Sequence, residues 1–336
     1  MSPRARTSWW LAAVGAALAV GLLLLAEPAS VLELAARTRL PHLLAAFIGT
    51  LALVVIRGAR LSLLAGRRLP PLRATAVVAV AQLASGVLPL RLGELALVPL
   101  LQAAGLPGAI RGLSLLVLGR VLDLAALLVW VVVAAAMIGG SPTVAIVGLA
   151  ILLPSFWLGS VIGLRWLRRV ARAWRQRPGW RRRSLLQLLR VRRELALAAR
   201  SPLRAWGSVA LSLLVWGAIW AVTLALLRGM GLPWPPGPVL LGVVGAALGS
   251  SLPVNSVGNF GTQEAGWAAA LAGVGVPVQQ ALAAGFACHL WVLVLLVPLG
   301  LAGAAYLIAV QPGRSASALL ASVRSFLRSE IGRAHV

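Results

Sequence analysis

The chain has 336 residues, of which 60% are hydrophobic and only 11% charged, and its mean hydropathy is +0.94. This composition excludes a water-soluble globular domain and predicts an integral membrane protein. The 31 basic residues are all arginines, so the chain has no lysine for a P-loop or a Schiff base. ATP-driven transport by this chain alone and pyridoxal chemistry are therefore not expected.

Cys288 is the only cysteine, and it occurs with three histidines. No CxxC or HExxH motif and no disulfide framework can be built from these residues, so we expect neither a metal nor another cofactor. The formal net charge is +24. Because the arginines lie between apolar runs, we interpret them as topology signals and as contacts to anionic lipid, and we expect no nucleic-acid partner.

Six apolar runs predict membrane spans, because a helix needs about 20 apolar residues to cross a bilayer. The expected spans are residues 9–25, 40–56, 113–138, 143–164, 206–227 and 281–309.

Arginines gather in alternate loops between these spans. Arg57 and Arg60 follow the second span, residues 165–205 are densely basic, and further arginines precede the first span and follow the last. The positive-inside rule places these segments and both termini in the cytoplasm, so we expect a multi-pass protein of the inner (cytoplasmic) membrane. The tryptophans of the 165–205 loop predict a helix that lies on the inner leaflet; the alternative is a plain topology anchor.

Two further apolar segments, residues 74–102 and 239–273, are interrupted and predict re-entrant hairpins of broken helix. The interrupting residues are Pro89 and Gly93 in the first segment, and Pro253, Gly258 and Gly261 in the second. The topology makes the first hairpin enter from the cytoplasm and the second from outside. Matching Pro and Glu positions predict an inverted repeat, which in transporters places the substrate site near the midplane. The alternative is a chance match of two hydrophobic hairpins.

Five ionisable residues lie inside the proposed membrane region, where an arginine or aspartate costs roughly 2.5 to 3.5 kcal/mol at a helix centre. They are Arg91, Glu94, Arg120, Asp123 and Glu264. Arg91 precedes a half-helix whose free N–H groups favour an anion, which predicts a phosphate site. The alternative is that Arg91 only pairs with Glu94, three residues later.

Arg120 and Asp123 are also three residues apart, so they are expected either to pair on one helix face or to leave Arg120 free to fold back onto the first hairpin. Glu264 begins the second half-helix, where it either caps the helix or carries a proton, and Thr262 is placed to cap the free amides.

Other polar residues at the same depth predict a lined cavity rather than lipid contact. They are Asn255, Asn259 and Gln263, with Gln82 and His289 as weaker candidates. A lone histidine in a span is more often a packing residue than a proton relay.

The segments Leu88–Glu94, Gly119–Leu124 and Pro253–Glu264 contain, in order, P-x-R-x-G-E, R-x-x-D-L and a Pro/Gly-rich break that ends in G-x-x-E. In these motifs the chain resembles the membrane domain of lysylphosphatidylglycerol synthases and related flippase-like proteins, over residues 40 to 309 at least. The glycine-poor turn around Ser256 departs from the family pattern. The resemblance implies translocation of a phospholipid or polyprenyl-phosphate-linked lipid between leaflets, by a membrane domain without the soluble aminoacyltransferase domain.

We therefore predict an all-α polytopic membrane protein with about six transmembrane helices and two inverted re-entrant hairpins, in a single domain at residues 1–329. Residues 330–336 resemble a translated sequencing adapter and are expected to be artefactual. The expected substrate-binding residues are Arg91, Glu94, Arg120, Asp123, Asn255, Asn259 and Glu264.

The expected function is transport of an anionic membrane lipid rather than catalysis. One alternative is an integral-membrane glycosyltransferase-type enzyme, although the sequence has no DxD motif. The other is a non-catalytic membrane partner of a lipid synthase or glycosyltransferase. A homo-oligomer is compatible with each alternative.

Overall fold

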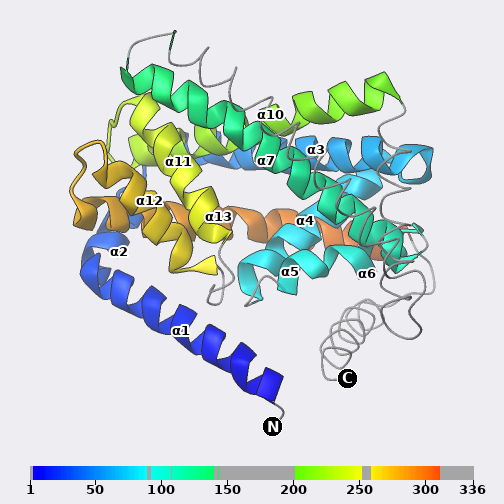
Figure 1. The fold of residues 1–336 in the computed structure, drawn as a ribbon, viewed down its shortest axis with the longest axis horizontal. Coiled ribbons are helices and arrows are strands. Elements are labelled where there is room, and N and C mark those ends of the chain that lie inside the picture. The colour runs from blue at the N-terminus through cyan, green and yellow to red at the C-terminus, as the bar shows by residue number, and fades with distance from the viewer. Residues whose placement is uncertain are drawn as a thin grey trace, which may run out of the picture.

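The computed structural model describes residues 3–88, 92–106, 108–139, 143, 201–251 and 259–310 (Figure 1). Every element in these ranges is helical, which confirms the all-α prediction for the described part of the chain. The elements are α1 (Pro3–Leu25), α2 (Pro28–Ala36), α3 (Leu40–Ala65), η1 (Gly66–Arg68), α4 (Pro71–Val87), α5 (Leu92–Leu95), α6 (Leu97–Ala103), α7 (Ala109–Gly139), α10 (Pro202–Gly229), α11 (Pro236–Ser250), α12 (Thr262–Ala272) and α13 (Val278–Ala309).

Four helices, α3, α7, α10 and α13, are long and apolar enough to cross a membrane. They confirm the spans predicted from the second, third, fifth and sixth apolar runs. The run at 9–25 belongs to a bent pair instead, because α1 and α2 meet at an angle of 73°. The span predicted at 143–164 and nearly all of the 165–205 loop lie outside the described residues. The protein is thus a polytopic membrane protein whose described part holds four candidate spans, or five with the bent pair.

Proline opens many of these helices, because its missing N–H would be unpaired at the first turn in any case. Prolines occupy the first or second position of α2, α3, α4, α10 and α11. Glycines with positive φ follow the ends of α6 and α12, at Gly105 with 90° and at Gly275 with 87°. In both, the next residue donates its N–H to a carbonyl five residues back. The same cap follows α10 at Gly231, so it is a general stop signal and not specific to the hairpins.

Both interrupted segments form antiparallel helix pairs. In the first, Gly93 lies so close to α4 that a Cβ there would be 2.2 Å from the Cα of Ser85. At the base of that hairpin, Arg73 Nη1 donates to the Ala104 carbonyl at 3.3 Å. In the second, a Cβ at Gly245 of α11 would be 2.3 Å from the carbonyl oxygen of Gly266 in α12. The breaking residues Pro89, Pro253 and Gly258 lie outside the described residues.

The bases of the two hairpins lie at opposite ends of α7 (Figure 1). The first hairpin ends a few residues before α7 begins, next to the end of α3, where Arg111 Nη2 donates to the Ala65 carbonyl at 3.0 Å. The second hairpin begins at the far end, where Gly237 packs against Met137 and Ile138. The helices of the two pairs therefore point toward each other across the middle of the long helices.

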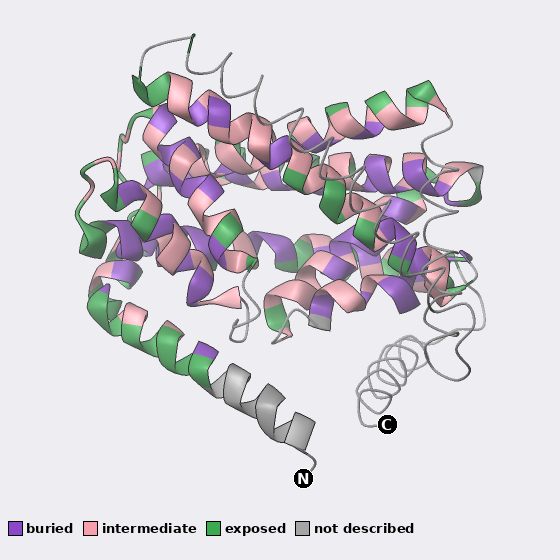
Figure 2. Ribbon diagram, in the orientation of Figure 1, coloured by how far each residue is buried: buried purple, intermediate pink, exposed green. Residues whose placement is uncertain are grey.

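Large apolar side chains are exposed on the outside of the bundle, and Figure 2 shows that most of the described part of α1 is exposed. Examples on four helices are Leu24, Leu40, Leu203 and Leu301, which are 61% to 77% exposed. Such a surface suits hydrocarbon, whereas in water it would favour aggregation.

Candidate functional site

A cavity of about 400 Å3 lies between the two hairpins, and the long helices α3, α7, α10 and α13 complete its walls. Predicted site residues from distant parts of the sequence meet in this lining. They are Glu94, Arg120, Asp123, Asn259 and Glu264, together with Gln82, Gln263 and His289. Two further predicted residues, Arg91 and Asn255, lie outside the described residues.

Arg57 and Arg60 also line the cavity, although neither was predicted to do so. The sequence prediction ended the second span at residue 56 and assigned both arginines to a cytoplasmic loop. This prediction is wrong, because α3 continues to Ala65. Arginine is a good helix former, so the helix continues where the uniformly apolar run stops. The available signal was the spacing of the pair, which places both side chains on one face of a longer helix.

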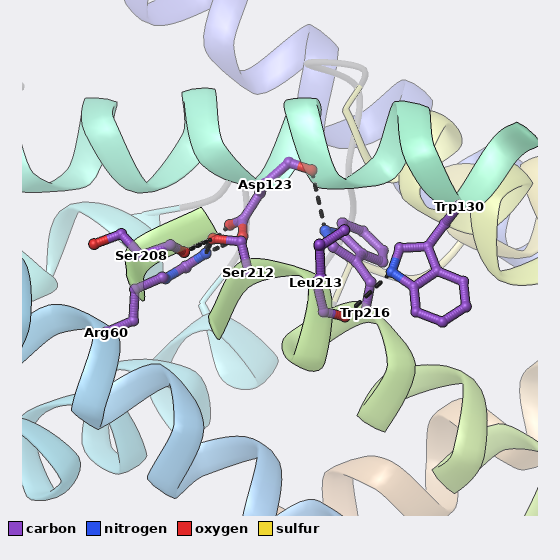
Figure 3. A network of polar contacts seen from close by, with 7 residues as sticks. All are labelled: Arg60, Asp123, Trp130, Ser208, Ser212, Leu213 and Trp216. Carbon is purple, nitrogen blue, oxygen red and sulfur yellow. Dashed lines mark hydrogen bonds and ion pairs between the residues drawn. The ribbon is translucent and has the colours of Figure 1, made fainter. Parts of the chain in front are cut away.

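Arg60 joins three helices through a largely buried ion pair (Figure 3). Its Nη1 donates to Oδ1 of Asp123 on α7 and, at 2.8 Å, to Oγ of Ser212 on α10, while Nη2 donates to Asp123 Oδ2 at 3.3 Å. Ser212 Oγ in turn donates to the Ser208 carbonyl. The side chains of Arg60 and Asp123 are 10% and 15% exposed. The pair therefore fixes α3, α7 and α10 around the cavity.

Two tryptophans add further contacts between α7 and α10 (Figure 3). Trp216 Nε1 donates to the backbone carbonyl of Asp123 at 3.1 Å, and Trp130 Nε1 donates to the Leu213 carbonyl at 3.1 Å. Buried indole N–H groups need such acceptors. Trp216 also lines the cavity. Its hydrogen bond therefore fixes α7 to α10 at the wall that these two helices form.

Arg120 forms an ion pair with Glu94 of the first hairpin. The predicted pair between Arg120 and Asp123 is therefore wrong, because Arg60 occupies the Asp123 carboxylate. The alternative prediction, in which Arg120 folds back onto the hairpin, is confirmed. The Arg120 side chain is still 50% exposed, and the residue lines the cavity.

Glu264 is almost fully buried, with 1% exposure, at the start of α12. Its Oε2 accepts the Gly261 N–H at 2.7 Å, and its Oε1 is hydrogen-bonded to Nδ1 of His289. The capping role predicted for Glu264 is confirmed. Thr262, predicted as a cap, is instead the first residue of the helix, and Gly261 holds the N-cap position with a φ of 103°.

His289 was predicted as a packing residue, and its role as the partner of Glu264 was missed. The two residues are 25 positions apart and meet only because α12 packs on α13. The ring centroids of Phe260 and His289 are 4.3 Å apart, so the Phe260 ring packs against the imidazole. The preceding Asn259 has a φ of 62° and a buried Oδ1 without a hydrogen-bond partner.

The cavity thus combines an apolar lining with two groups of charged side chains, one on α3, α5 and α7 and one at the start of α12. No cluster of three or more metal-ligating residues occurs among the residues that were described. Guanidinium groups held at membrane depth suit an anionic ligand.

Comparison with protein families matches residues 11–323 to the lysylphosphatidylglycerol synthase TM region. Comparisons with curated proteins and with solved structures gave no significant match. The matched range contains both hairpins and every residue of the cavity lining. The chain therefore belongs to the lysylphosphatidylglycerol synthase transmembrane-region family.

Proposed function

We propose that the protein moves an anionic lipid, a phospholipid or a polyprenyl-phosphate-linked lipid, between the two leaflets of the inner membrane. The observation that carries this proposal is the cavity, in which charged side chains from both hairpins meet inside an otherwise apolar bundle. Charged residues at this depth are costly and usually mark a substrate path. Membership of a family named for lysylphosphatidylglycerol synthesis supports a lipid substrate.

The opposed hairpins support transport rather than simple binding. When broken helices enter from opposite sides as an inverted repeat, the site between them can open alternately to one side of the membrane and to the other. A lipid headgroup would enter the cavity while its acyl chains remain against the exposed apolar faces. In this proposal the first hairpin enters from the cytoplasm, where both termini lie.

The proposed headgroup contacts are the predicted set of Arg91, Glu94, Arg120, Asp123, Asn255, Asn259 and Glu264. Arg120 is the best placed of the described members, because it lines the cavity and half of its side chain is exposed. Asp123 acts through Arg60, which it holds in position.

Filling the cavity tests the proposal. Gly119 lines the cavity on α7, and the nearest described atom to a Cβ there is Arg60 Nη2 at 3.8 Å, an ordinary contact distance. Gly119→Leu should therefore occupy cavity space without a backbone clash. The matched control on the same helix is Gly139→Leu, since Gly139 is exposed and a Cβ there meets nothing within 4 Å.

The measurement uses liposomes that contain the full chain and a fluorescent phosphatidylglycerol, which dithionite bleaches from outside. Wild type and Gly139→Leu should expose the inner-leaflet label faster than protein-free liposomes, and Gly119→Leu should slow this step. Equal rates for Gly119→Leu and wild type would remove the cavity from the path. Wild-type protein that exposes the label no faster than protein-free liposomes, and that co-purifies with a lipid synthase or glycosyltransferase, would instead favour the role of a non-catalytic membrane partner.

A further inference from the structure

Arg57 differs from the other described arginines of the cavity, because no ion pair joins it to another described residue. It lies one turn before Arg60 on α3 and lines the same cavity. Its Nε is buried without a hydrogen-bond partner. The ion pairs found among the described residues do not include Arg57.

The carboxylates nearest to Arg57 already have partners. Arg57 is within electrostatic range of Asp123 and Glu94, and also of Arg60 and Arg120. Asp123 is paired with Arg60, and Glu94 is paired with Arg120. In this described cluster three guanidinium groups therefore face two carboxylates, which leaves one positive charge in excess.

Glu264, the other carboxylate of the cavity, does not supply the missing charge. It is held by the Gly261 N–H and by His289. Arg57 is half-buried, with its Nε buried and without a partner. An uncompensated cation at membrane depth is unfavourable, so its counter-ion is expected to come from a ligand.

We propose that Arg57 binds the phosphodiester of a lipid headgroup. A phosphodiester carries a negative charge, which would compensate an arginine that the described carboxylates leave without an ion pair. The planar guanidinium can donate two parallel hydrogen bonds to phosphate oxygens. This inference rests on the proposed function for its choice of a lipid, and it adds the residue that binds the phosphate.

Native mass spectrometry of the detergent-purified chain tests the inference by lipid retention. Wild type should retain added phosphatidylglycerol in preference to diacylglycerol with the same acyl chains. Arg57→Gln should lower phosphatidylglycerol retention about tenfold or more, because a hydrogen bond to a charged group is lost. Arg57→Lys should be intermediate, since it keeps the charge but not the planar pair of donors. The matched control is Arg228→Gln, which removes an exposed arginine at the end of α10 and should behave as wild type.

Several outcomes would overturn the inference. If Arg57→Gln retained phosphatidylglycerol at the wild-type level, Arg57 would not belong to the binding site. If wild type showed no preference for phosphatidylglycerol over diacylglycerol, the phosphate would not be recognised at all, and this result does not depend on whether Arg57→Gln folds. Displacement of the lipid by millimolar inorganic phosphate would identify a free anion as the ligand. A wild type that retains lipid through Arg57 but does not translocate it would contradict only the proposed function; translocation that is indifferent to Arg57 would contradict only this inference.

Discussion

The charged side chains of the cavity are compensated mainly by groups on other elements. Arg60 on α3 pairs with Asp123 on α7, Arg120 on α7 pairs with Glu94 on α5, and Glu264 contacts His289 on α13. The first pair is largely buried, whereas the Arg120 side chain is half exposed. Because the cost of breaking an ion pair rises with burial, the two arginines should contribute unequally to stability.

We expect Arg60→Gln to destabilise the protein by about 3 to 5 kcal/mol, because it leaves Asp123 charged and without its main partner. Arg120→Gln should cost at most about 1 kcal/mol, because solvent and the cavity screen that pair. Thermal unfolding in detergent, followed by tryptophan fluorescence, compares the two variants. Equal melting temperatures would show that the Arg60 pair does not hold α3, α7 and α10 together.

Glu264 allows its two predicted roles to be separated by chemistry. Glu264→Gln keeps an oxygen for the Gly261 N–H and should melt close to wild type, whereas Glu264→Ala removes both hydrogen bonds and should cost about 1 to 3 kcal/mol. Thermal unfolding tests the capping role, and equal melting of the two variants would contradict it. The same variants in the liposome assay test the proton-carrying role, which predicts that Glu264→Gln is stable but does not translocate lipid.

The sequence identified most of the ionisable residues of the site but few of their partners. Arg120, Asp123 and Glu264 are conspicuous because charge is rare in an apolar run. Their partners depend on which helices pack together, and that information is absent from local spacing. The i, i+3 rule therefore favoured Arg120 with Asp123, while packing placed Arg60 nearer to the same carboxylate.

At the scale of elements, close glycine contacts hold each hairpin together. A Cβ at Gly245 would lie 2.3 Å from a backbone oxygen of α12, and a Cβ at Gly93 would lie 2.2 Å from the backbone of α4. The Cβ of an alanine at either position could not rotate away from these backbone atoms. The two helices of the hairpin would therefore have to move apart.

We expect Gly245→Ala and Gly93→Ala each to destabilise the protein by about 1 to 3 kcal/mol. The control is Gly21→Ala on α1, where a Cβ meets nothing within 4 Å and the change should stay within about 0.5 kcal/mol. Melting temperatures in detergent give the comparison. Tolerance of Gly245→Ala and Gly93→Ala alike would contradict the close packing of the hairpins.

Helix positions could be predicted from the sequence where one physical rule dominates. Long apolar runs predicted α3, α7, α10 and α13, because a span must bury its backbone polar groups internally. The end of α3 was placed too early, since arginines mark both loops and functional helix faces. The bend between α1 and α2 was also missed, because Pro28 was not distinguished from an ordinary loop residue.

At the scale of the whole molecule, the two ends of the long helices differ in charge. Arginines without acidic neighbours lie at the end where α3 stops and α7 and α10 begin, namely Arg68, Arg73, Arg111 and Arg204. The other end of the bundle carries Arg37, Arg39 and Arg228 together with Glu27 and Glu33, so its net charge is lower. Arginine-rich ends stay in the cytoplasm during insertion. The end with Arg68 should therefore face the cytoplasm, and the base of the second hairpin should face outward.

Cysteine labelling can test this orientation, because Arg68 and Arg228 are both exposed and lie at opposite ends. With the buried Cys288 replaced by alanine, Arg228→Cys should react with a membrane-impermeant maleimide in intact spheroplasts. Arg68→Cys should react only after the membrane is opened. The Cys288→Ala parent without an added cysteine gives the background. If Arg68→Cys reacted in intact spheroplasts and Arg228→Cys did not, the topology would be inverted and the second hairpin would be the cytoplasmic one. If both cysteines reacted in intact spheroplasts, the membrane would not separate the two ends.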